Sequence, residues 1–183
     1  ELGRQELRNS LVDTRLSYAL ARFETLAHQV TLDPESGTGD AVGSMIVFPE
    51  DKLSDVLHNT AMACRAGLCM GGRVAVIKAG EQVGGVLVPS GKAGLMVLST
   101  VTVDGLLLSR GIMFRPTFAG IVEVSERRVR RFIDVLEYGR DSRDPIEILT
   151  LAGGTNVRQV VEQGQGLLLA DVREVVSVAR ERV

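Results

Sequence analysis

The sequence predicts an α+β fold: mixed, largely antiparallel β-sheets with short helices packed on them and an N-terminal amphipathic helix. Three observations predict it. Apolar residues recur at helical spacing near the N-terminus, and short apolar runs separated by Gly- and Pro-containing turns fill the middle of the chain. Helices and strands also do not alternate strictly, which disfavours a parallel α/β sheet. The 183 residues, 45% of them hydrophobic, can bury a core, and we expect a single domain over residues 1–183.

The N-terminal third of the chain predicts a helix, a hairpin and a second helix. Apolar residues spaced three to five apart favour an amphipathic helix over residues 4–27. His28–Leu32 and Ala41–Phe48 are expected to pair as a hairpin around the turn-forming segment 33–40. Pro49, Glu50 and Asp51 are typical of a helix start, and Gly67 of its end.

The middle of the chain predicts three strands followed by a helix. The strands are expected at Val74–Lys78, Val83–Val88 and Ala93–Leu98. The last of them is nearly all apolar over 94–98, which indicates a central strand covered on both faces. A short helix is then expected over Val103–Ser109, ending at Gly111.

The C-terminal third predicts a hairpin and further short elements. Turn residues 125–128 separate its two apolar strands, and Asp144-Pro145 and Asn156 are typical of helix starts. The expected elements are strands Phe118–Val124 and Val129–Tyr138, helix Pro145–Leu151, a helix from Asn156 to Gln163, strand Leu167–Val172 and a closing helix Arg173–Val183.

Composition argues against several classes of function. A formal net charge of −2 lacks the basic excess of a nucleic-acid-binding module, and 4% aromatic residues with no Trp disfavour a base-stacking surface. No apolar run approaches the roughly 20 residues of a membrane span, and the first residues resemble no signal peptide. We therefore expect a cytoplasmic protein without a membrane partner. Because the chain does not begin with Met, we also expect a longer protein around it.

Residue types that carry out catalysis or bind metals are sparse. The histidines are His28 and His58, outside any H-x-x-x-H or H-E-x-x-H spacing, and neither a G-x-S-x-G motif nor a phosphate-binding loop occurs. We therefore expect no catalytic residues, no metal and no cofactor. An enzyme would need an acid–base pair assembled from distant residues such as Asp104, Glu123 or Asp134.

Neither the two cysteines nor the densest basic run is expected to form a binding site. Cys64 and Cys69 form a C-x4-C spacing without the second pair that a zinc site requires, so we expect inert buried thiols in a reducing compartment. The run Arg127–Arg131 is expected to be a solvated hairpin turn rather than a nucleic-acid contact.

The stretch Gly94–Gly120 is where a ligand site is predicted. A buried strand there ends in hydroxyls and runs into a helix start, where free backbone N–H groups suit a carboxylate or phosphate. The candidate ligand-binding residues are Ser99, Thr100, Thr102, Asp104 and Arg115. The simpler interpretation is N-capping by Ser99 or Thr100 without a ligand, and Arg110 and Arg115 can equally be surface charges.

The order of several segments resembles the regulatory domain of NrpR-type repressors, which are transcription factors of nitrogen assimilation. The resemblance covers most of residues 22–175. It is carried by the segments 22–39, 84–94 and 99–108, by Gly111-Ile112, Pro116, Phe118-Ala119-Gly120 and Val122-Glu123-Val124, and by Asp144-Pro145 with its helix.

The resemblance implies a homodimeric effector-binding domain, with DNA contacted only through an upstream winged-helix domain absent from this chain, to which residues 1–27 lead. In the archaeal repressors the effector is 2-oxoglutarate, whose two carboxylates suit the hydroxyls and N–H groups near Ser99. A cysteine can stand near that position in the family, so the chemistry there can differ. A structural dimerisation module without a ligand and a small-molecule enzyme are the alternatives.

Overall fold

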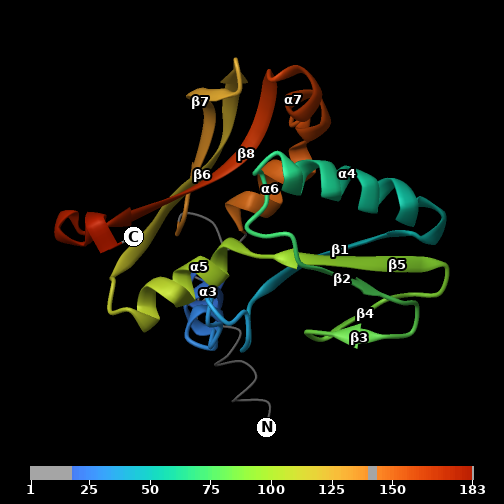
Figure 1. Cartoon of the computed structure of the whole chain (residues 1–183), viewed down its shortest axis with the longest axis horizontal. Coiled ribbons are helices and arrows are strands. Elements are labelled where there is room, and N and C mark those ends of the chain that lie inside the picture. Colours follow the sequence, from blue (N-terminus) through green and yellow to red (C-terminus); the bar gives the residue numbers. More distant parts are fainter. Residues whose placement is uncertain (1–17, 140–143, 183) are drawn as a thin grey trace, which may run out of the picture. The chain divides into compact units, whose positions relative to one another are not determined.

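The computed structural model describes residues 18–139 and 144–182 (Figure 1). Contacts group the chain into two compact units, one of residues 29–106 and one of residues 1–28 with 107–183. The expected N-terminal helix is present as α3 (Tyr18–Ala27). The rest of that prediction, residues 4–17, lies outside the described residues.

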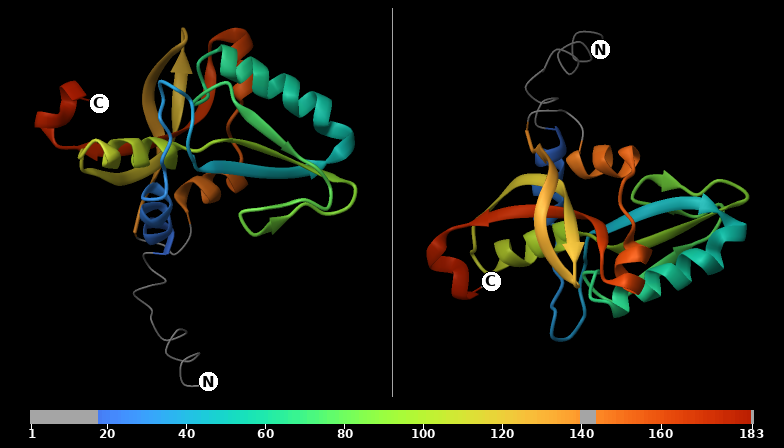
Figure 2. Two further views of the ribbon diagram at one scale, coloured as in Figure 1. Left: turned by 60° about the horizontal axis from the view of Figure 1, so that its bottom comes forward. Right: turned by 90° about the horizontal axis from the view of Figure 1, so that it is seen from above.

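The unit of residues 29–106 is built on a three-stranded antiparallel sheet. Its order is β1 (Gly43–Pro49), β5 (Lys92–Leu98), β2 (Val74–Ile77), which confirms the prediction that the apolar strand is central. Leu95 on β5 is 1% exposed. The 3-10 helix η1 (Glu50–Lys52) leads into α4 (Leu53–Arg65), which lies across one face of the sheet, with the chain between β2 and β5 on the other side (Figures 1 and 2).

The predicted hairpin of His28–Leu32 with Ala41–Phe48 is wrong. Strand β1 pairs with β5 instead, and residues 28–32 form no strand. The Asp33 carboxylate accepts hydrogen bonds from the Glu35 N–H (3.0 Å) and the Ser36 hydroxyl (2.7 Å), which closes a tight turn. The turn carries an isolated bridge between Asp33 and Thr38, whereas β1 pairs with the apolar β5 over seven residues.

The predicted strand Val83–Val88 is instead a small hairpin. It consists of β3 (Gln82–Val83) and β4 (Val86–Leu87), joined by Gly84 and Gly85 at φ of +58° and +82°. Two consecutive residues at positive φ make the tight turn that antiparallel strands prefer. The Gly-Gly pair therefore reverses the chain in the middle of the predicted strand.

Helix α5 (Thr100–Ser109) begins three residues earlier than the sequence predicts. Ser99 is the residue that precedes it, and its hydroxyl accepts a hydrogen bond from the Val101 N–H at 3.3 Å. Gly111, at φ +68°, follows the helix as expected.

The other unit contains a second three-stranded antiparallel sheet, in the order β7 (Arg128–Glu137), β6 (Phe114–Ser125), β8 (Gly166–Val175). The predicted β6–β7 hairpin is confirmed. The predicted closing helix Arg173–Val183 is wrong in its first part, because Arg173–Val175 continue β8 and pair with the first residues of β6. A 3-10 helix, η2 (Ser177–Arg182), follows.

Two capped helices adjoin this sheet, at the starts that the sequence predicts. Asp144 accepts from the Ile146 N–H at the start of α6 (Pro145–Ala152), and Asn156 accepts from the Gln159 N–H at the start of α7 (Val157–Gln163). Helix α6 covers the core of the unit, which comprises Ala119, Ile121 and Leu149 with Leu136, Tyr138, Ile146, Leu167 and Leu169 around them.

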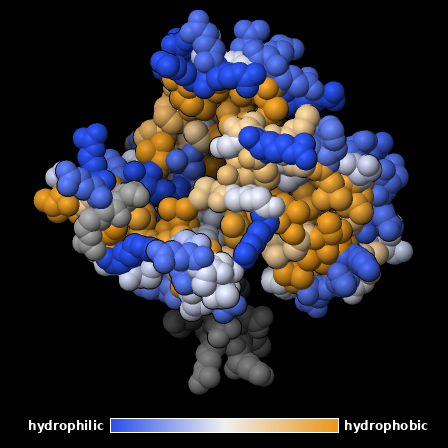
Figure 3. All heavy atoms as spheres, viewed as in Figure 1, coloured by the Kyte–Doolittle hydropathy of each residue, from blue (hydrophilic) through white to orange (hydrophobic). Residues whose placement is uncertain are grey.

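Hydrophobic side chains remain exposed in both units (Figure 3). In the unit of residues 29–106 they include Val74, Val76, Val86 and Leu87, on β2 and β4. In the other unit β7 exposes Val129, Phe132, Ile133 and Val135, here called the apolar β7 patch. Within the described residues, no helix combines the length and the apolar character needed to cross a membrane.

Candidate functional site

The predicted ligand site lies at the junction of β5 and α5. Three polar groups of Ser99 form hydrogen bonds there. Its N–H donates to the Val42 carbonyl (2.9 Å), its carbonyl accepts from the Thr102 N–H (3.0 Å), and its hydroxyl caps Val101. The capping interpretation of Ser99 therefore describes what its hydroxyl does in this structure.

The Thr102 hydroxyl both donates and accepts a hydrogen bond. The Thr102 Oγ1 donates to the Val42 carbonyl at 2.8 Å and accepts from the Val42 N–H at 3.0 Å. Thr102 is 3% exposed, so these bonds satisfy a buried polar group. The segment that enters β1 is thereby attached to the first turn of α5.

The remaining candidate residues lie in different surroundings. Thr100 is the first residue of α5, and Asp104, on the same helix, is 0% exposed. A carboxyl group buried to that degree must be held by hydrogen bonds or by charge. Arg115 belongs to the other unit, where it lies on β6 opposite Glu174 of β8. The junction thus brings together Ser99, Thr100, Thr102 and Asp104.

The residues considered for acid–base chemistry have other roles or positions. Glu123 on β6 forms an ion pair with Arg131 on β7 at 2.9 Å, and Asp134 is exposed on β7. Arg127 occupies the hairpin turn at φ +59°, whereas Arg128–Arg131, which the sequence predicts in the turn as well, begin β7; all of them are exposed, and Arg130 pairs with Glu126. Among residues 18–139 and 144–182, no group of three or more His, Cys, Asp or Glu side chains could hold a metal ion.

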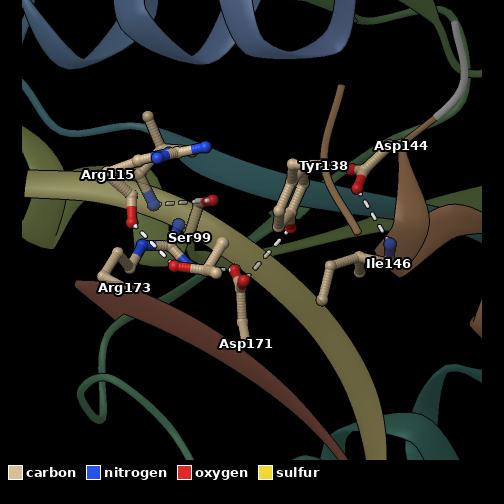
Figure 4. A network of polar contacts seen from close by, with 9 residues as sticks. Ser99, Arg115, Tyr138, Asp144, Ile146, Asp171 and Arg173 are labelled. Carbon is tan, nitrogen blue, oxygen red and sulfur yellow. Dashed lines mark hydrogen bonds and ion pairs between the residues drawn. The ribbon is translucent and has the colours of Figure 1, made fainter. Parts of the chain in front are cut away.

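A buried polar cluster in the second unit was not predicted. The Tyr138 hydroxyl donates to Asp171 Oδ1 at 3.1 Å, and the Arg173 guanidinium forms an ion pair with the other carboxylate oxygen (Figure 4). The side chains of Asp171 and Arg173 are only 7% and 13% exposed. The cluster lies at the end of the core that α6 covers, beside the ring of Phe23, whose centroid is 5.9 Å from that of Tyr138.

The electrostatics of this cluster follow from its burial. Burial, and then the negative charge of Asp171, raise the pKa of the Tyr138 phenol above its ordinary value. Burial also raises the pKa of Asp144, while the hydrogen bond from the Ile146 N–H opposes that effect. Tyr138 therefore remains protonated and donates its hydrogen bond at every physiological pH.

The sequence carries a signal for this cluster. Asp171 interrupts the apolar run Leu167–Val172, and a carboxylate inside a buried strand needs a cationic partner. Arg173, two residues further along β8, lies on the same face of the sheet. The prediction missed the pair because it ended the strand at Val172.

Both units together match a family of regulatory domains in transcription, which is not a class of enzymes. The family model described as NrpR regulatory domains NRD1 and 2 matches residues 16–183, and the chain belongs to this family. The global nitrogen regulator NrpRI of Methanosarcina mazei is 33% identical over 181 residues, which are 99% of this chain and 55% of that protein.

A second regulator and a solved structure are also similar to this chain. The global nitrogen regulator NrpR of Methanocaldococcus jannaschii is 25% identical over 169 residues, 92% of this chain and 28% of that protein. The crystal structure of the nitrogen repressor-like protein MJ0159 from Methanococcus jannaschii has a similar fold, with a TM-score of 0.72 and 24% identity, covering 90% of this chain and 66% of that one. The chain therefore spans about half or less of the length of these two regulators.

Proposed function

We propose that this domain senses a small dicarboxylate, with 2-oxoglutarate as the first candidate, and dimerises within a transcriptional regulator of nitrogen metabolism. Membership of the NrpR regulatory-domain family over residues 16–183 is the observation that carries the proposal. DNA would be contacted through a different domain of the regulator. The effector acts by binding one dimer arrangement more tightly than another.

The β5–α5 junction supplies groups that suit a carboxylate. Ser99 and Thr100 open a ten-residue helix, so hydroxyls lie beside backbone N–H groups at the positive end of the helix dipole. Thr102 and Asp104 follow on the same helix. The proposed carboxylate site therefore consists of these junction residues, all of which lie in the unit of residues 29–106.

The dimerisation part of the proposal is supported by strand β7. It is the outer strand of its sheet, and it exposes Phe132 (38%), Ile133 (48%), Val135 (47%) and Val129 (62%). Apolar residues grouped in this way on a surface typically mark a protein contact. A second copy of the chain placed on the apolar β7 patch would bury it.

Calorimetric titration with 2-oxoglutarate tests effector binding. We expect saturable heat and a rise in melting temperature, with the affinity lowered severalfold in T100V and unchanged in R128Q, which alters an exposed Arg at the start of β7. Succinate and glutamate serve as ligand controls. Absence of heat and of any melting shift up to millimolar 2-oxoglutarate would remove this effector from the proposal.

Sedimentation velocity tests dimerisation separately. We expect V135D to shift the domain toward the monomer, whereas L151D, which introduces the same charge at a 79% exposed position on α6, leaves association unchanged. A monomeric wild-type domain at all accessible concentrations would contradict self-association through this patch.

A second candidate function is a dimerisation module without a ligand. The observation that favours it is that the junction hydroxyls already form hydrogen bonds with the backbone of the domain. The Ser99 hydroxyl accepts from the Val101 N–H, and the Thr102 hydroxyl forms two hydrogen bonds with Val42. A domain that sediments as a dimer and gives no heat with any dicarboxylate would favour this candidate over the sensor.

A further inference from the structure

The end of helix α4 folds the chain back on its own last turn. The Leu68 N–H donates to the Ala63 carbonyl (3.0 Å), and the Gly67 N–H donates to the Cys64 carbonyl (3.1 Å). These two bonds, with Gly67 at φ +74°, form a Schellman cap. The reversal returns residue 69 to the side of residue 64.

The two thiols of the domain therefore lie in contact. Cys69 shares a side-chain hydrogen bond with Cys64, and the Cys64 thiol donates to the Gly71 carbonyl at 3.6 Å. Both cysteines are free and only partly buried. Small oxidants can consequently reach a pair of sulfur atoms that are already adjacent, five residues apart in sequence.

The loop after Cys69 adjoins the end of β5. At Gly71 a Cβ atom would lie 3.2 Å from Leu98 Cδ1, so the loop backbone packs closely on the last residue of β5. Arg73, two residues further on, donates to the Gly37 carbonyl at 2.6 Å. A movement of the loop at the thiol pair would therefore be felt at Leu98, which immediately precedes Ser99.

We propose that Cys64 and Cys69 are a redox-responsive dithiol, which peroxide-class oxidants close into an intramolecular disulfide, and that closure rearranges the loop against Leu98. One thiolate attacks peroxide: an S–O bond forms, the O–O bond breaks, and hydroxide leaves as water after protonation. The other thiol then attacks the sulfenic sulfur, so that the S–S bond forms and a second water leaves. Two thiols are oxidised and one peroxide is reduced.

The Cys69 thiol is the one that burial protects from mild oxidants. Burial, reinforced by the hydrogen bond with Cys64, raises the pKa of Cys69 to about 11. Because the thiolate is the nucleophile, Cys69 reacts slowly at neutral pH and faster as pH rises toward 11. Closure also removes the Cys64 proton that is donated to Gly71, which is how oxidation loosens the loop.

Peroxide treatment of the whole domain, followed by intact mass and by maleimide labelling of unfolded protein, tests the disulfide. We expect the loss of two hydrogen atoms and of both reactive thiols in single chains, at a rate independent of protein concentration. The variants C64S and C69S should lose this product and retain the melting temperature of the reduced wild type. Oxygen addition without a disulfide, or disulfides only between chains, would overturn the proposal.

Hydrogen exchange tests the coupling to β5. In the oxidised wild type we expect faster amide exchange at residues 70–73 and 98–99 than in the reduced protein, with no change in peroxide-treated C64S. Identical exchange in the oxidised and reduced wild type would overturn the coupling. Neither experiment uses an effector, so both results are independent of the proposed sensing function.

Discussion

Thr102 on helix α5 binds both backbone polar groups of Val42, sixty residues earlier in the chain. The Val42 N–H donates to the threonine hydroxyl at 3.0 Å, and that hydroxyl donates to the Val42 carbonyl at 2.8 Å. The same carbonyl also accepts the Ser99 N–H at 2.9 Å. The start of β1 and the start of α5 are therefore connected through one residue, whatever ligand the junction holds.

Thr102→Val should destabilise the domain by about 1–3 kcal/mol, because the Val42 N–H loses its partner in a part-buried position. The Val42 carbonyl keeps the Ser99 N–H, so the loss comes mainly from the donor. Urea unfolding measures it. Thr102→Ser, which keeps the hydroxyl, should lose less, and Thr155→Val at an exposed position should change stability very little. Equal stability of T102V and the wild type would contradict the role of this hydroxyl.

Substitutions at Tyr138 and at Asp171 should destabilise the domain by different amounts, because each removes a different interaction from the buried polar cluster. Tyr138→Phe removes one hydrogen bond to a carboxylate, for an expected loss of about 1.5–3 kcal/mol. Asp171→Asn removes the negative charge beside the 13% exposed Arg173, for an expected loss of about 3–5 kcal/mol. Chemical denaturation measures both. A double-mutant cycle between Tyr138 and Asp171 should show coupling, and additive losses would contradict a direct hydrogen bond.

Elements governed by local signals could be predicted from the sequence. Asp144 before Pro145 and Asn156 before α7 are capping residues, and the structure places both hydrogen bonds as expected. The β6–β7 hairpin likewise follows from two apolar runs around one short turn. In each case the partners are a few residues apart, so sequence spacing determines the geometry.

Features that depend on distant partners could not be predicted. Strand β1 pairs with β5, about fifty residues later, and nothing near β1 distinguishes that partner from His28–Leu32. Arg173 was predicted in a helix because its pairing with Pro116 is a long-range property of the sheet. The candidate ligand residues of α5 were named from local hydroxyl chemistry, whereas the bonds between Thr102 and Val42 are set by the fold.

Asp144→Asn should change the pH dependence of stability. Burial raises the folded-state pKa of Asp144 above its ordinary 3.8, so the ionised carboxylate costs the folded state free energy. That cost is absent below about pH 3.8, grows as pH rises from there through the folded-state pKa, and stays constant above it. Asparagine keeps the cap without the charge.

We therefore expect D144N to be at least as stable as the wild type at pH 7, with the difference vanishing in acid. Asp144→Ala loses the cap as well, so it should be about 1 kcal/mol less stable than D144N across the whole pH range, because neither variant titrates at this position. Thermal melts from pH 3 to pH 8 compare the three proteins. A D144N protein as unstable at pH 7 as D144A would show that the charge, rather than the hydrogen-bond acceptor, holds α6.

Gly67→Ala should affect stability and the thiol pair together. Nothing lies within 4 Å of a Cβ at Gly67, so its φ of +74° is the source of strain, at about 1–2 kcal/mol for a non-glycine residue. Gly72→Ala is the matched control: its site is equally open and has no positive φ, so alanine there should be neutral or slightly stabilising. Because the cap at Gly67 places Cys69 beside Cys64, G67A should also slow peroxide-driven disulfide formation, and G72A should leave its rate unchanged. If G67A lost stability but closed the disulfide at the wild-type rate, the Schellman cap would not be what positions the two sulfur atoms.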